Sequence, residues 1–412
     1  MSEVKPFPCI RPNQSVAHRI AALPYDVYNR EEAKQEVIKE PISFLRIDRA
    51  EINFDDNVDM YDPRVYEKAK EILDQMINQG DFVVDNDECY YIYELVMDGR
   101  SQTGIVACAS IDDYLNNVIK KHENTREEKE LDRITHVDVC NAQTGPIFLA
   151  YRSKEEINKV VEETKTDKPL YSFTSNDGIE HYVWRISDTE KVVILKNAFS
   201  NISDIYIADG HHRAASAVKV GLKRRKENPG YSGDEEFNYF LSVLFPHDQL
   251  MILPYNRTVR DLNGLCNEHF LEKINENFEV LKNGNVPYSP KEKATFGMLF
   301  DGEWYILKAK EDIINNDDPV KALDVSILQD YLLSPILGID DPRKDNRIDF
   351  IGGIRGLKEL ERRTLQDMRV AFSMYPTSIE ELFAVSDAGM LMPPKSTWFE
   401  PKLRSGLFIH SI

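Results

Sequence analysis

One short segment constrains the fold of this chain more than any other. Residues 205–208 (Ile-Tyr-Ile-Ala) are mostly β-branched or aromatic, which favours a strand, and residues 209–210 (Asp-Gly) favour a turn. Residues 214–220 favour a helix, and Gly221 stands where a helix commonly ends. The sequence therefore predicts a strand, a turn and a helix, with residues 211–213 (His-His-Arg) in the first helical turn.

The first turn of this helix is suited to an anion such as phosphate. Its backbone N–H groups have no partners within the helix, and the positive end of the helix dipole lies there. Gly210 permits close approach of the backbone to a ligand. The side chains of His211, His212 and Arg213 can donate hydrogen bonds. Asp209 could hold a metal ion or orient a histidine. The alternative is a helix capped by Asp209 whose histidines are polar surface.

A second group of polar residues stands upstream, where His122 and Glu123 precede Thr125 and the pair 132–133 (Asp-Arg). A carboxylate beside a histidine and a hydroxyl can act as a general base or as a metal ligand. Glu123 is therefore a candidate base. The alternative is that the charged stretch 122–133 is a solvated helix or loop, since most Glu side chains of an acidic chain face water.

A third group suggests a different chemistry. If residues 136–138 form a strand, His136 and Asp138 point to the same face of it, because side chains alternate along a strand. Together with His211 and His212 they could form the metal centre of a hydrolase. No His-x-x-x-His or His-x-His pattern supports that centre, so the histidines could equally be structural.

Two later segments are candidates for ligand contact. The loop 352–356 (Gly-Gly-Ile-Arg-Gly) precedes a helical pattern but lacks the Lys-Ser/Thr of a P-loop, and turn geometry explains its glycines equally well. The tail 395–406 is a basic island in an acidic chain and could contact a phosphate or a carboxylate. The alternative for the tail is an ordinary turn before a closing strand at 407–409.

Charge and composition exclude several classes of protein. The 412 residues carry 51 basic and 70 acidic side chains, a net charge of -19, and such a field repels nucleic acid phosphates. No run of about 18 apolar residues could span a bilayer, and the amino terminus does not resemble a secretory signal. The five cysteines form no Cys-x-x-Cys pair. We therefore expect no DNA binding and no membrane contact, and a cytoplasmic location.

The pattern of elements favours an α+β fold with mixed sheets and helices, since strands and helices alternate without a βαβ rhythm. Strands at 90–97 and 103–110 are expected to form a hairpin around Asp98-Gly99, and strands at 239–245 and 251–253 a second hairpin. Further expected elements are helices at 64–80, 111–121, 321–333 and 357–370. We expect a core domain at 1–265 and a smaller α+β portion at 266–412 whose tail returns to the active site.

The 209–213 segment resembles the Gly-x-His-Arg phosphate-binding motif of the ParB/sulfiredoxin superfamily. Over nearly its full length the chain also resembles a conserved prokaryotic family known as domain of unknown function 1015. The residues that carry the second resemblance are Arg11-Pro12, Pro24-Tyr25-Asp26-Val27, His122, Glu123 and Thr125, Asp132-Arg133, the 209–213 core, and residues 392–397, 402 and 405–407.

The superfamily resemblance implies a ParB/sulfiredoxin-like core with insertions and a chemistry of nucleotide phosphates. Its members include CTP-binding partitioning proteins, an ATP-using sulfinic acid reductase and kinases of free L-serine, whose motif is similar to the one here. The reductase uses a cysteine where this chain has His211, so sulfinic acid reduction is excluded. A DNA clamp would need a helix-turn-helix module and a basic surface, and the chain shows neither.

Together, the sequence and this resemblance predict a nucleotide-dependent phosphotransferase that uses ATP or ADP with Mg²⁺. Its acceptor is a small hydroxyl metabolite, with free L-serine first to be tested. The residues expected to hold the transferred or adjacent phosphate are Gly210, His211, His212 and Arg213. Asp209 would bind Mg²⁺ or orient a histidine, and Glu123, by resemblance to the kinases' catalytic glutamate, would accept the hydroxyl proton. Lys402 and Ser405 would bind the substrate.

Two other functions remain open, a metal-dependent phosphoester hydrolase and a nucleotide-binding regulator without turnover. The expected partners are a nucleotide and a small-molecule substrate, and a homodimer is compatible with the sequence.

Overall fold

The computed structural model describes residues 2–412, which form two compact units. The first comprises the residues up to Leu250 together with Pro401–Ile412, and the second comprises Met251–Glu400. The expected border between residues 265 and 266 falls inside the second unit, because strands at 251–259 pair with strands of that unit. The tail 401–412, expected in the smaller portion, belongs to the first unit because residues 409–411 pair with two of its strands.

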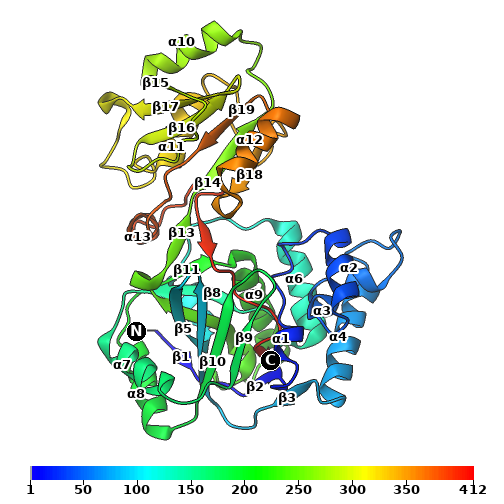
Figure 1. Cartoon of the computed structure of the whole chain (residues 1–412). Coiled ribbons are helices and arrows are strands. Elements are labelled where there is room, and N and C mark those ends of the chain that lie inside the picture. The colour runs from blue at the N-terminus through cyan, green and yellow to red at the C-terminus, as the bar shows by residue number, and fades with distance from the viewer. Residues whose placement is uncertain (1) are drawn as a thin grey trace. The chain divides into compact units, whose positions relative to one another are not determined.

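A nine-stranded sheet forms the core of the first unit (Figure 1). In spatial order its strands are β6 (Ile119–Lys120), β11 (Ile205–Asp209), β8 (Ile147–Tyr151), β12 (Tyr239–Pro246), β5 (Arg100–Ser110), β4 (Tyr90–Met97), β10 (Glu180–Ile186) and β9 (Tyr171–Thr174), with β1 (Val4–Lys5) also paired to β5. The β11/β6 and β12/β8 pairs are parallel, and the other pairs are antiparallel. This mixed sheet, covered by helices, confirms the predicted α+β class.

The β4–β5 hairpin forms as predicted around Asp98 and Gly99, whose φ angles are 52° and 77°. Two positive φ angles in a two-residue loop match the twist of the paired strands. The second expected hairpin is wrong. β13 (Met251–Leu253) pairs with β20 (Trp398–Glu400) and not with β12, because a short 3₁₀ turn, η3 (His247–Gln249), ends β12 and leads the chain into the second unit.

The helices of the first unit cover this sheet and a smaller one. They are α1 (Ala17–Ile20), α2 (Arg30–Lys39), α3 (Leu45–Asp48), α4 (Pro63–Asn78), α5 (Ile111–Leu115), α6 (Glu127–Cys140), α7 (Glu155–Lys165), α8 (Thr189–Ser200) and α9 (His211–Glu227), with 3₁₀ turns η1 (Ala50–Asn53) and η2 (Glu236–Asn238). Apolar side chains of α7, α8 and α9 pack with those of the nine-stranded sheet in the main core cluster. The helix expected at 111–121 ends early, because Asn117 has a φ of 59° and residues 119–120 pair with β11.

The smaller sheet fixes the end of the chain in the first unit. Its strands, in order, are β3 (Phe82–Val84), β2 (Cys9–Pro12), β21 (Ile409–Ser411) and β7 (Ala142–Gln143). The predicted closing strand at 407–409 therefore forms about two residues later. Leu407, Phe408 and Ile409 are fully buried, so the tail contributes apolar side chains to the interior of this unit.

The second unit has its own six-stranded sheet, whose pairings are all antiparallel. In order the strands are β15 (Phe278–Gly284), β17 (Glu303–Ala309), β16 (Thr295–Phe300), β19 (Val370–Ser373), β14 (Tyr255–Val259) and β18 (Ile348–Gly352). Its helices are α10 (Asn267–Asn277), α11 (Asp324–Leu328), α12 (Gly356–Gln366) and α13 (Ile379–Asp387), with the shorter η4 (Glu311–Ile313), η5 (Gln329–Leu333, a π-helix) and η6 (Gly353–Arg355). The helix expected at 357–370 ends early because residues 370–373 form a central strand, paired on both sides.

Within residues 2–412, no helix combines the length and apolar character needed to cross a bilayer.

Candidate active site

The strand, turn and helix around Gly210 form as predicted. β11 ends at Asp209, and α9 begins at His211. Gly210 has a φ of 95°, in the left-handed region that side chains rarely adopt, and a Cβ added there would lie 3.1 Å from Nε and Nη2 of Arg213. Glycine is therefore required here for two reasons, the backbone angle and the guanidinium that lies over the turn.

The first backbone N–H groups of α9 have no partner within the helix. Among the residues described, no side chain caps this end of the helix. The first backbone N–H of α9 that donates to the turn is that of Ala214, and its acceptor is the carbonyl of Gly210. The Asp209 carboxylate accepts only the N–H of Gly210 from this segment, at 2.9 Å. The N–H groups of residues 211–213 are thus available to an anion at the positive end of the helix dipole. The alternative of a helix whose N-terminus is capped by the Asp209 side chain therefore does not describe this turn.

Gly221 does not end α9, which continues to Glu227. A Cβ at this position would lie 2.4 Å from the carbonyl oxygen of Phe237, so the glycine permits close packing of α9 against the chain before β12. The expectation that Gly221 stops the helix is therefore wrong, and close packing is the physical reason for the residue.

Asp209 is held by the tail of the chain. Its Oδ2 atom lies 3.0 Å from Nζ of Lys402. Burial alone would raise the pKa of Asp209, but the charges of Lys402 and Arg213 hold it well below its usual range. Asp209 is therefore a carboxylate at neutral pH, and Lys402 is brought to the start of α9.

His211 and His122 form a buried pair beside Asp209. Their ring centroids are 4.5 Å apart, with the rings nearly perpendicular. The backbone N–H of His122 points at Nε2 of His211 from 3.5 Å, which places the proton of neutral His211 on Nδ1, 3.9 Å from Oε2 of Glu123. Burial lowers the pKa of His122 to about 4, and burial followed by the neighbouring His122 holds the pKa of His211 well below its usual range. Both rings are neutral at pH 7, and His211 is not polar surface.

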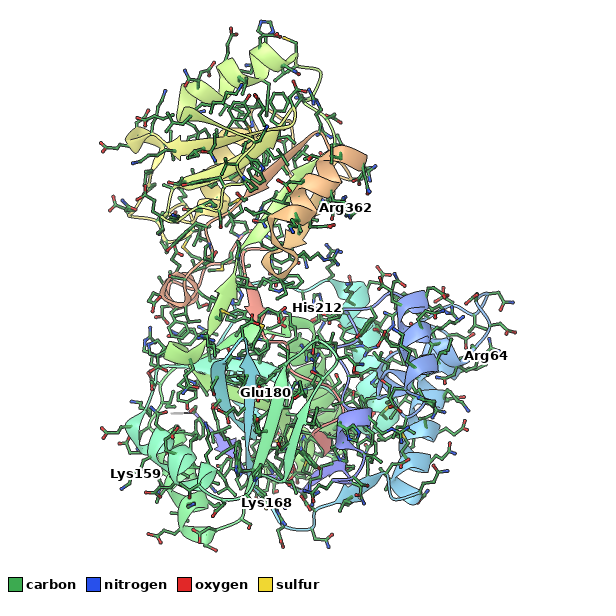
Figure 2. All side chains as sticks on the ribbon, viewed as in Figure 1. Arg64, Lys159, Lys168, Glu180, His212 and Arg362 are labelled. Carbon is green, nitrogen blue, oxygen red and sulfur yellow. The ribbon has the colours of Figure 1, made fainter. Side chains whose placement is uncertain are left out.

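His212 fastens the segment that carries Glu123. Its Nε2 atom accepts the N–H of Arg126 at 2.9 Å, and Figure 2 locates the side chain. Burial, with the nearby charge of Lys129, lowers the pKa of His212, which suits an acceptor nitrogen. Thr125 adds a second tie by donating to Oε1 of Glu130 at 3.1 Å. The structure therefore places Glu123, His211 and Asp209 in one neighbourhood, although Glu123 is 43% exposed.

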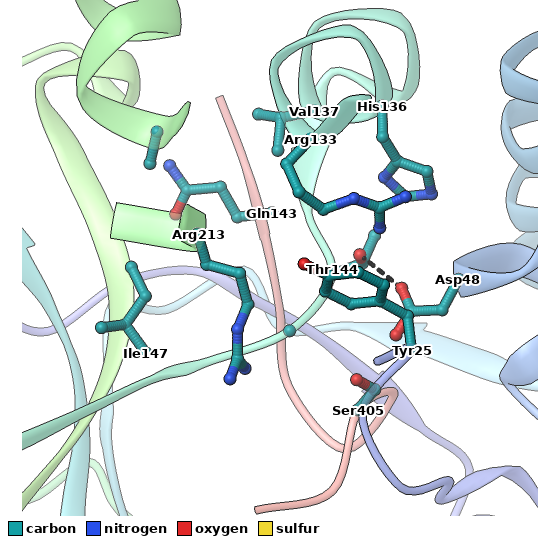
Figure 3. Close-up of a pocket in the computed structure, with 12 residues that line it drawn as sticks. Tyr25, Asp48, Arg133, His136, Val137, Gln143, Thr144, Ile147, Arg213 and Ser405 are labelled. Carbon is teal, nitrogen blue, oxygen red and sulfur yellow. Dashed lines mark hydrogen bonds between the residues drawn. The ribbon is translucent and has the colours of Figure 1, made fainter. Parts of the chain in front are cut away.

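Arg213 extends the site from the helix terminus into a cavity. Its Nη1 atom donates to the carbonyl of Pro146 at 2.5 Å, and its side chain lines a cavity of about 30 Å³ (Figure 3). Ser405 lines the same cavity and is 2% exposed. Its backbone is paired with Ala22, with an N–H to carbonyl distance of 2.9 Å. Lys402 and Ser405, both predicted as substrate residues, thus lie on the side of the first unit that carries Asp209 and Arg213.

Other lining residues of the cavity were not predicted as site residues. They include Tyr25, Asp48, Arg133 and Thr144, whereas His136, which also lines the cavity, was a candidate only for the hydrolase metal centre. Two of them, Tyr25 and Arg133, lie in motifs that carry the family resemblance, at residues 24–27 and 132–133. Nothing in the sequence marks Asp48 or Thr144, because their roles depend on the packing of α3 against the chain before β8.

The third group of predicted ligands is not brought together. Residues 136–138 belong to α6 and not to a strand, so His136 and Asp138 do not share a face. Nε2 of His136 lies 3.1 Å from the carbonyl of Ile47, and Asp138 pairs with Lys223 at 2.6 Å. Lys223 is three helical turns along α9 from His212, roughly 16 Å at 1.5 Å per residue. The four-residue hydrolase centre therefore does not form.

The glycine loop 352–356 belongs to the second unit. A Cβ at Gly352 would lie 2.7 Å from the Trp398 ring, and one at Gly353 would lie 2.7 Å from Pro254. Close packing against Trp398 and Pro254 therefore accounts for these two glycines.

The predicted Mg²⁺ site depends on Asp209. Within residues 2–412 no cluster of three His, Cys, Asp or Glu side chains could hold a metal ion. Both oxygens of Asp209 already have partners, Gly210 N–H and Lys402 Nζ. These residues do not form a metal site by themselves. Asp209 as a Mg²⁺ ligand stays a prediction.

The fold and site define an α+β protein in which a helix N-terminus and buried histidines lie beside a small cavity in the unit built on a mixed sheet. The model of the family described as protein of unknown function (DUF1015) matches residues 4–326, and the chain belongs to that family. No curated protein sequence matches the chain.

Several solved structures have a partly similar arrangement. A mutant of free serine kinase in complex with AMP is 14% identical, with a TM-score of 0.36, over 74% of this chain and 92% of that chain. A conserved hypothetical protein from Pyrococcus furiosus is 13% identical, with a TM-score of 0.35, over 74% and 95%. SbnI with a C-terminal truncation, from Staphylococcus aureus, is 11% identical, with a TM-score of 0.40, over 74% and 87%.

Proposed function

We propose that this protein is a nucleotide-dependent phosphotransferase that acts on a small hydroxyl metabolite, with free L-serine the first acceptor to test. The observation that supports this most directly is the uncapped start of α9, where the free N–H groups of residues 211–213 and the Arg213 guanidinium gather around Gly210. Phosphoryl transfer depends mainly on positioning and on neutralising charge, and these groups supply both. A ParB/sulfiredoxin-like core, a cytoplasmic location and a homodimer belong to the same proposal.

The nucleotide, ATP or ADP, is a substrate in this scheme and would bring any Mg²⁺ with its own phosphates. The first-turn N–H groups and Arg213 would bind the transferred phosphoryl group. The acceptor hydroxyl oxygen forms the new P–O bond while the bond to the leaving phosphate breaks, and Glu123 takes the hydroxyl proton. His211, neutral and buried, would orient Glu123 through Nδ1, which lies 3.9 Å from its carboxylate.

The role of His212 is narrower in this proposal than a direct phosphate contact. Its ring nitrogen Nε2 is occupied by the Arg126 N–H, so it would act by holding the segment that carries Glu123. Asp209 would keep Lys402 at the start of α9, where the ammonium group adds positive charge for the phosphate.

A direct assay tests the proposal. Full-length protein is incubated with ATP or ADP, Mg²⁺ and L-serine, and the mixture is followed by phosphorus NMR and mass spectrometry. Phosphoserine that forms in proportion to enzyme supports the proposal. A nucleotide that raises the melting temperature without any product would instead support the non-catalytic regulator.

Arg213→Gln serves as the variant for this assay, with Lys226→Gln as the matched control. Lys226 is an exposed cation at the other end of the same helix. Turnover that falls for Arg213→Gln and not for Lys226→Gln locates the chemistry at the start of α9. Equal turnover in both variants would rule out this site.

A further inference from the structure

The tail of the chain carries a buried arginine, Arg404, two residues after Lys402. Its side chain is 3% exposed, and Nη2 donates to Oδ2 of Asp177 at 2.5 Å and to Oγ of Ser175 at 3.0 Å. Its Nε atom points at Nε2 of His181 from 3.4 Å. These three partners belong to β10 and to the loop between β9 and β10, in the same unit as the tail. The tail is therefore attached to a hairpin that is distant from it in sequence.

The loop between β9 and β10 is arranged to receive this guanidinium. Oγ of Ser175 donates to Oδ1 of Asp177 at 2.6 Å, and Oδ2 accepts from Arg404. Burial alone would raise the pKa of Asp177, but the charge of Arg404 and its hydrogen bond lower it. Asp177 is therefore a carboxylate at neutral pH, and a carboxylate that accepts from a guanidinium forms a strong and directional contact.

A buried histidine contacts the same guanidinium. The ring of His181 stacks against Tyr93 and Phe173, with ring centroids 5.9 Å and 4.9 Å away. Burial and the charge of Arg404 lower the pKa of His181 to about 3, so the ring is neutral at pH 7. Nδ1 lies 2.9 Å from the Tyr93 hydroxyl, which leaves Nε2 to face the Nε–H donor of Arg404. The guanidinium contacts the loop and this ring together, which restricts its orientation.

The chain between Arg404 and Lys402 is too short to absorb a displacement of either residue. Two residues span at most about 7 Å. Leu403, which stands between them, is buried and apolar, so Arg404 is the first polar anchor that follows Lys402. On its other side, Ser405 pairs with Ala22 through two backbone hydrogen bonds. The position of Lys402 therefore depends on where Arg404 is held.

We infer that Arg404 is a positioning residue: held by the loop between β9 and β10, it keeps the ammonium group of Lys402 at Asp209 and the start of α9. Its effect on catalysis rests on the proposed function, in which Lys402 adds positive charge for the phosphate. Arg404 contacts no ligand in this scheme and acts only through Lys402. The placement of Lys402 itself is measurable without any substrate.

Labelling of lysines with acetic anhydride, followed by mass spectrometry, measures the placement of Lys402 directly. Its side chain is 18% exposed beside Asp209, so a released ammonium group should be acetylated faster. We expect the rate at Lys402 to rise about tenfold in Arg404→Gln, as loss of a charged hydrogen bond predicts. Lys165, which is 22% exposed and paired with Glu94 in the same unit, is the internal reference and should keep its rate.

Asp177→Asn keeps the test decisive if the first variant does not fold. The Asp177 side chain is 42% exposed, and its substitution leaves the buried guanidinium in place while removing the charge of its partner. Asp87→Asn is the matched control, since Asp87 is an exposed carboxylate that pairs with Arg185 of β10 at 3.0 Å. Faster acetylation of Lys402 in Asp177→Asn and not in Asp87→Asn supports the inference. Wild-type rates in both variants, or equal acceleration of the reference lysine, would overturn it.

A double-mutant cycle tests the effect on catalysis. Arg404→Gln and Lys402→Met should each lower turnover, and the double variant should be no slower than Lys402→Met alone, because Arg404 acts through Lys402. Arg404→Lys keeps the charge but not the planar fork, and it should retain part of the turnover. Single effects that multiply in the double variant would show that Arg404 acts by another route, which would also overturn the inference.

The two hypotheses fail in different ways. If no acceptor is phosphorylated but Lys402 is acetylated faster in the Arg404 and Asp177 variants, the positioning role stands and the phosphotransferase does not. If phosphoserine forms but the acetylation rate of Lys402 is the same in every variant, the phosphotransferase stands and the positioning role does not.

Discussion

Nζ of Lys402 lies 3.0 Å from Oδ2 of Asp209, across 193 residues of sequence. This contact brings the tail of the chain to the start of α9 in the first unit. A second contact anchors the same tail, since the buried Arg404 donates to Asp177 at 2.5 Å. The tail is therefore held in the first unit beside the start of α9.

Lys402→Met should destabilise the protein, because the Asp209 carboxylate loses its strongest neighbouring charge. We expect a loss of about 1–2 kcal/mol in the free energy of unfolding, below the value for a fully buried pair because both groups are partly exposed. Urea denaturation at pH 7 measures it. The double variant Lys402→Met with Asp209→Asn should recover part of the loss, and a double variant no more stable than the single one would show that the pair does not interact.

Gly210→Ala should both strain the backbone and displace Arg213. The strain at positive φ is worth about 1–3 kcal/mol, and the added Cβ would lie 3.1 Å from the guanidinium. Gly178→Ala is the matched control, since Gly178 has a φ of 81° and nothing within 4 Å of an added Cβ. Both variants should lose stability in urea, but only Gly210→Ala should lose turnover and L-serine binding. Loss of turnover in the Gly178 variant would point to general instability.

Stability should fall as the pH drops from 6.5 toward 4, in the absence of divalent cations. His122 has an ordinary pKa of 6.5 that burial lowers to about 4, so in this range the unfolded chain binds a proton that the folded chain does not. The effect of His122 alone reaches at most about 3 kcal/mol at pH 4. The negative charge of Asp209 acts in the opposite direction and raises the pKa of His122, but burial has the larger effect.

Urea denaturation of His122→Asn at pH 4.5 and at pH 7 checks this linkage. The difference in stability between the two pH values should be smaller for His122→Asn than for the wild type. Substitution of the exposed His18 by Asn should leave the difference unchanged. The same difference in wild type and His122→Asn would show that this ring does not titrate as its burial predicts.

Glu123→Gln should lower turnover by about 10²–10⁴ with little change in nucleotide binding, as removal of a general base does. Glu127→Gln changes an exposed carboxylate on the same charged stretch and should leave turnover unchanged. The pH dependence of kcat gives a second readout, because the rise in rate assigned to the base should disappear with Glu123. Equal turnover of the two variants would remove Glu123 from the mechanism.

The sequence predicted those parts of the fold that depend on local interactions. The β-branched run at 205–208, the glycine at 210 and the helix formers after it specify a strand, a left-handed turn and a helix without help from distant residues. The Asp98-Gly99 hairpin follows from the same local rule. Local rules failed where contacts between distant segments decided the outcome: Gly221 looks like a helix stop but serves the packing against Phe237, and residues 136–138 form part of a helix.

The sequence by itself determined that residues 209–213 form a turn that leads from a strand into a helix, because backbone angles and the free N–H groups of a helix start are local properties of the chain. Only the tertiary structure decided what surrounds that turn. The buried His122–His211 pair and the Lys402–Asp209 contact join segments that are far apart in sequence. Burial lowers the pKa values of these two histidines, and burial is a property of the packed chain that residue order alone does not display.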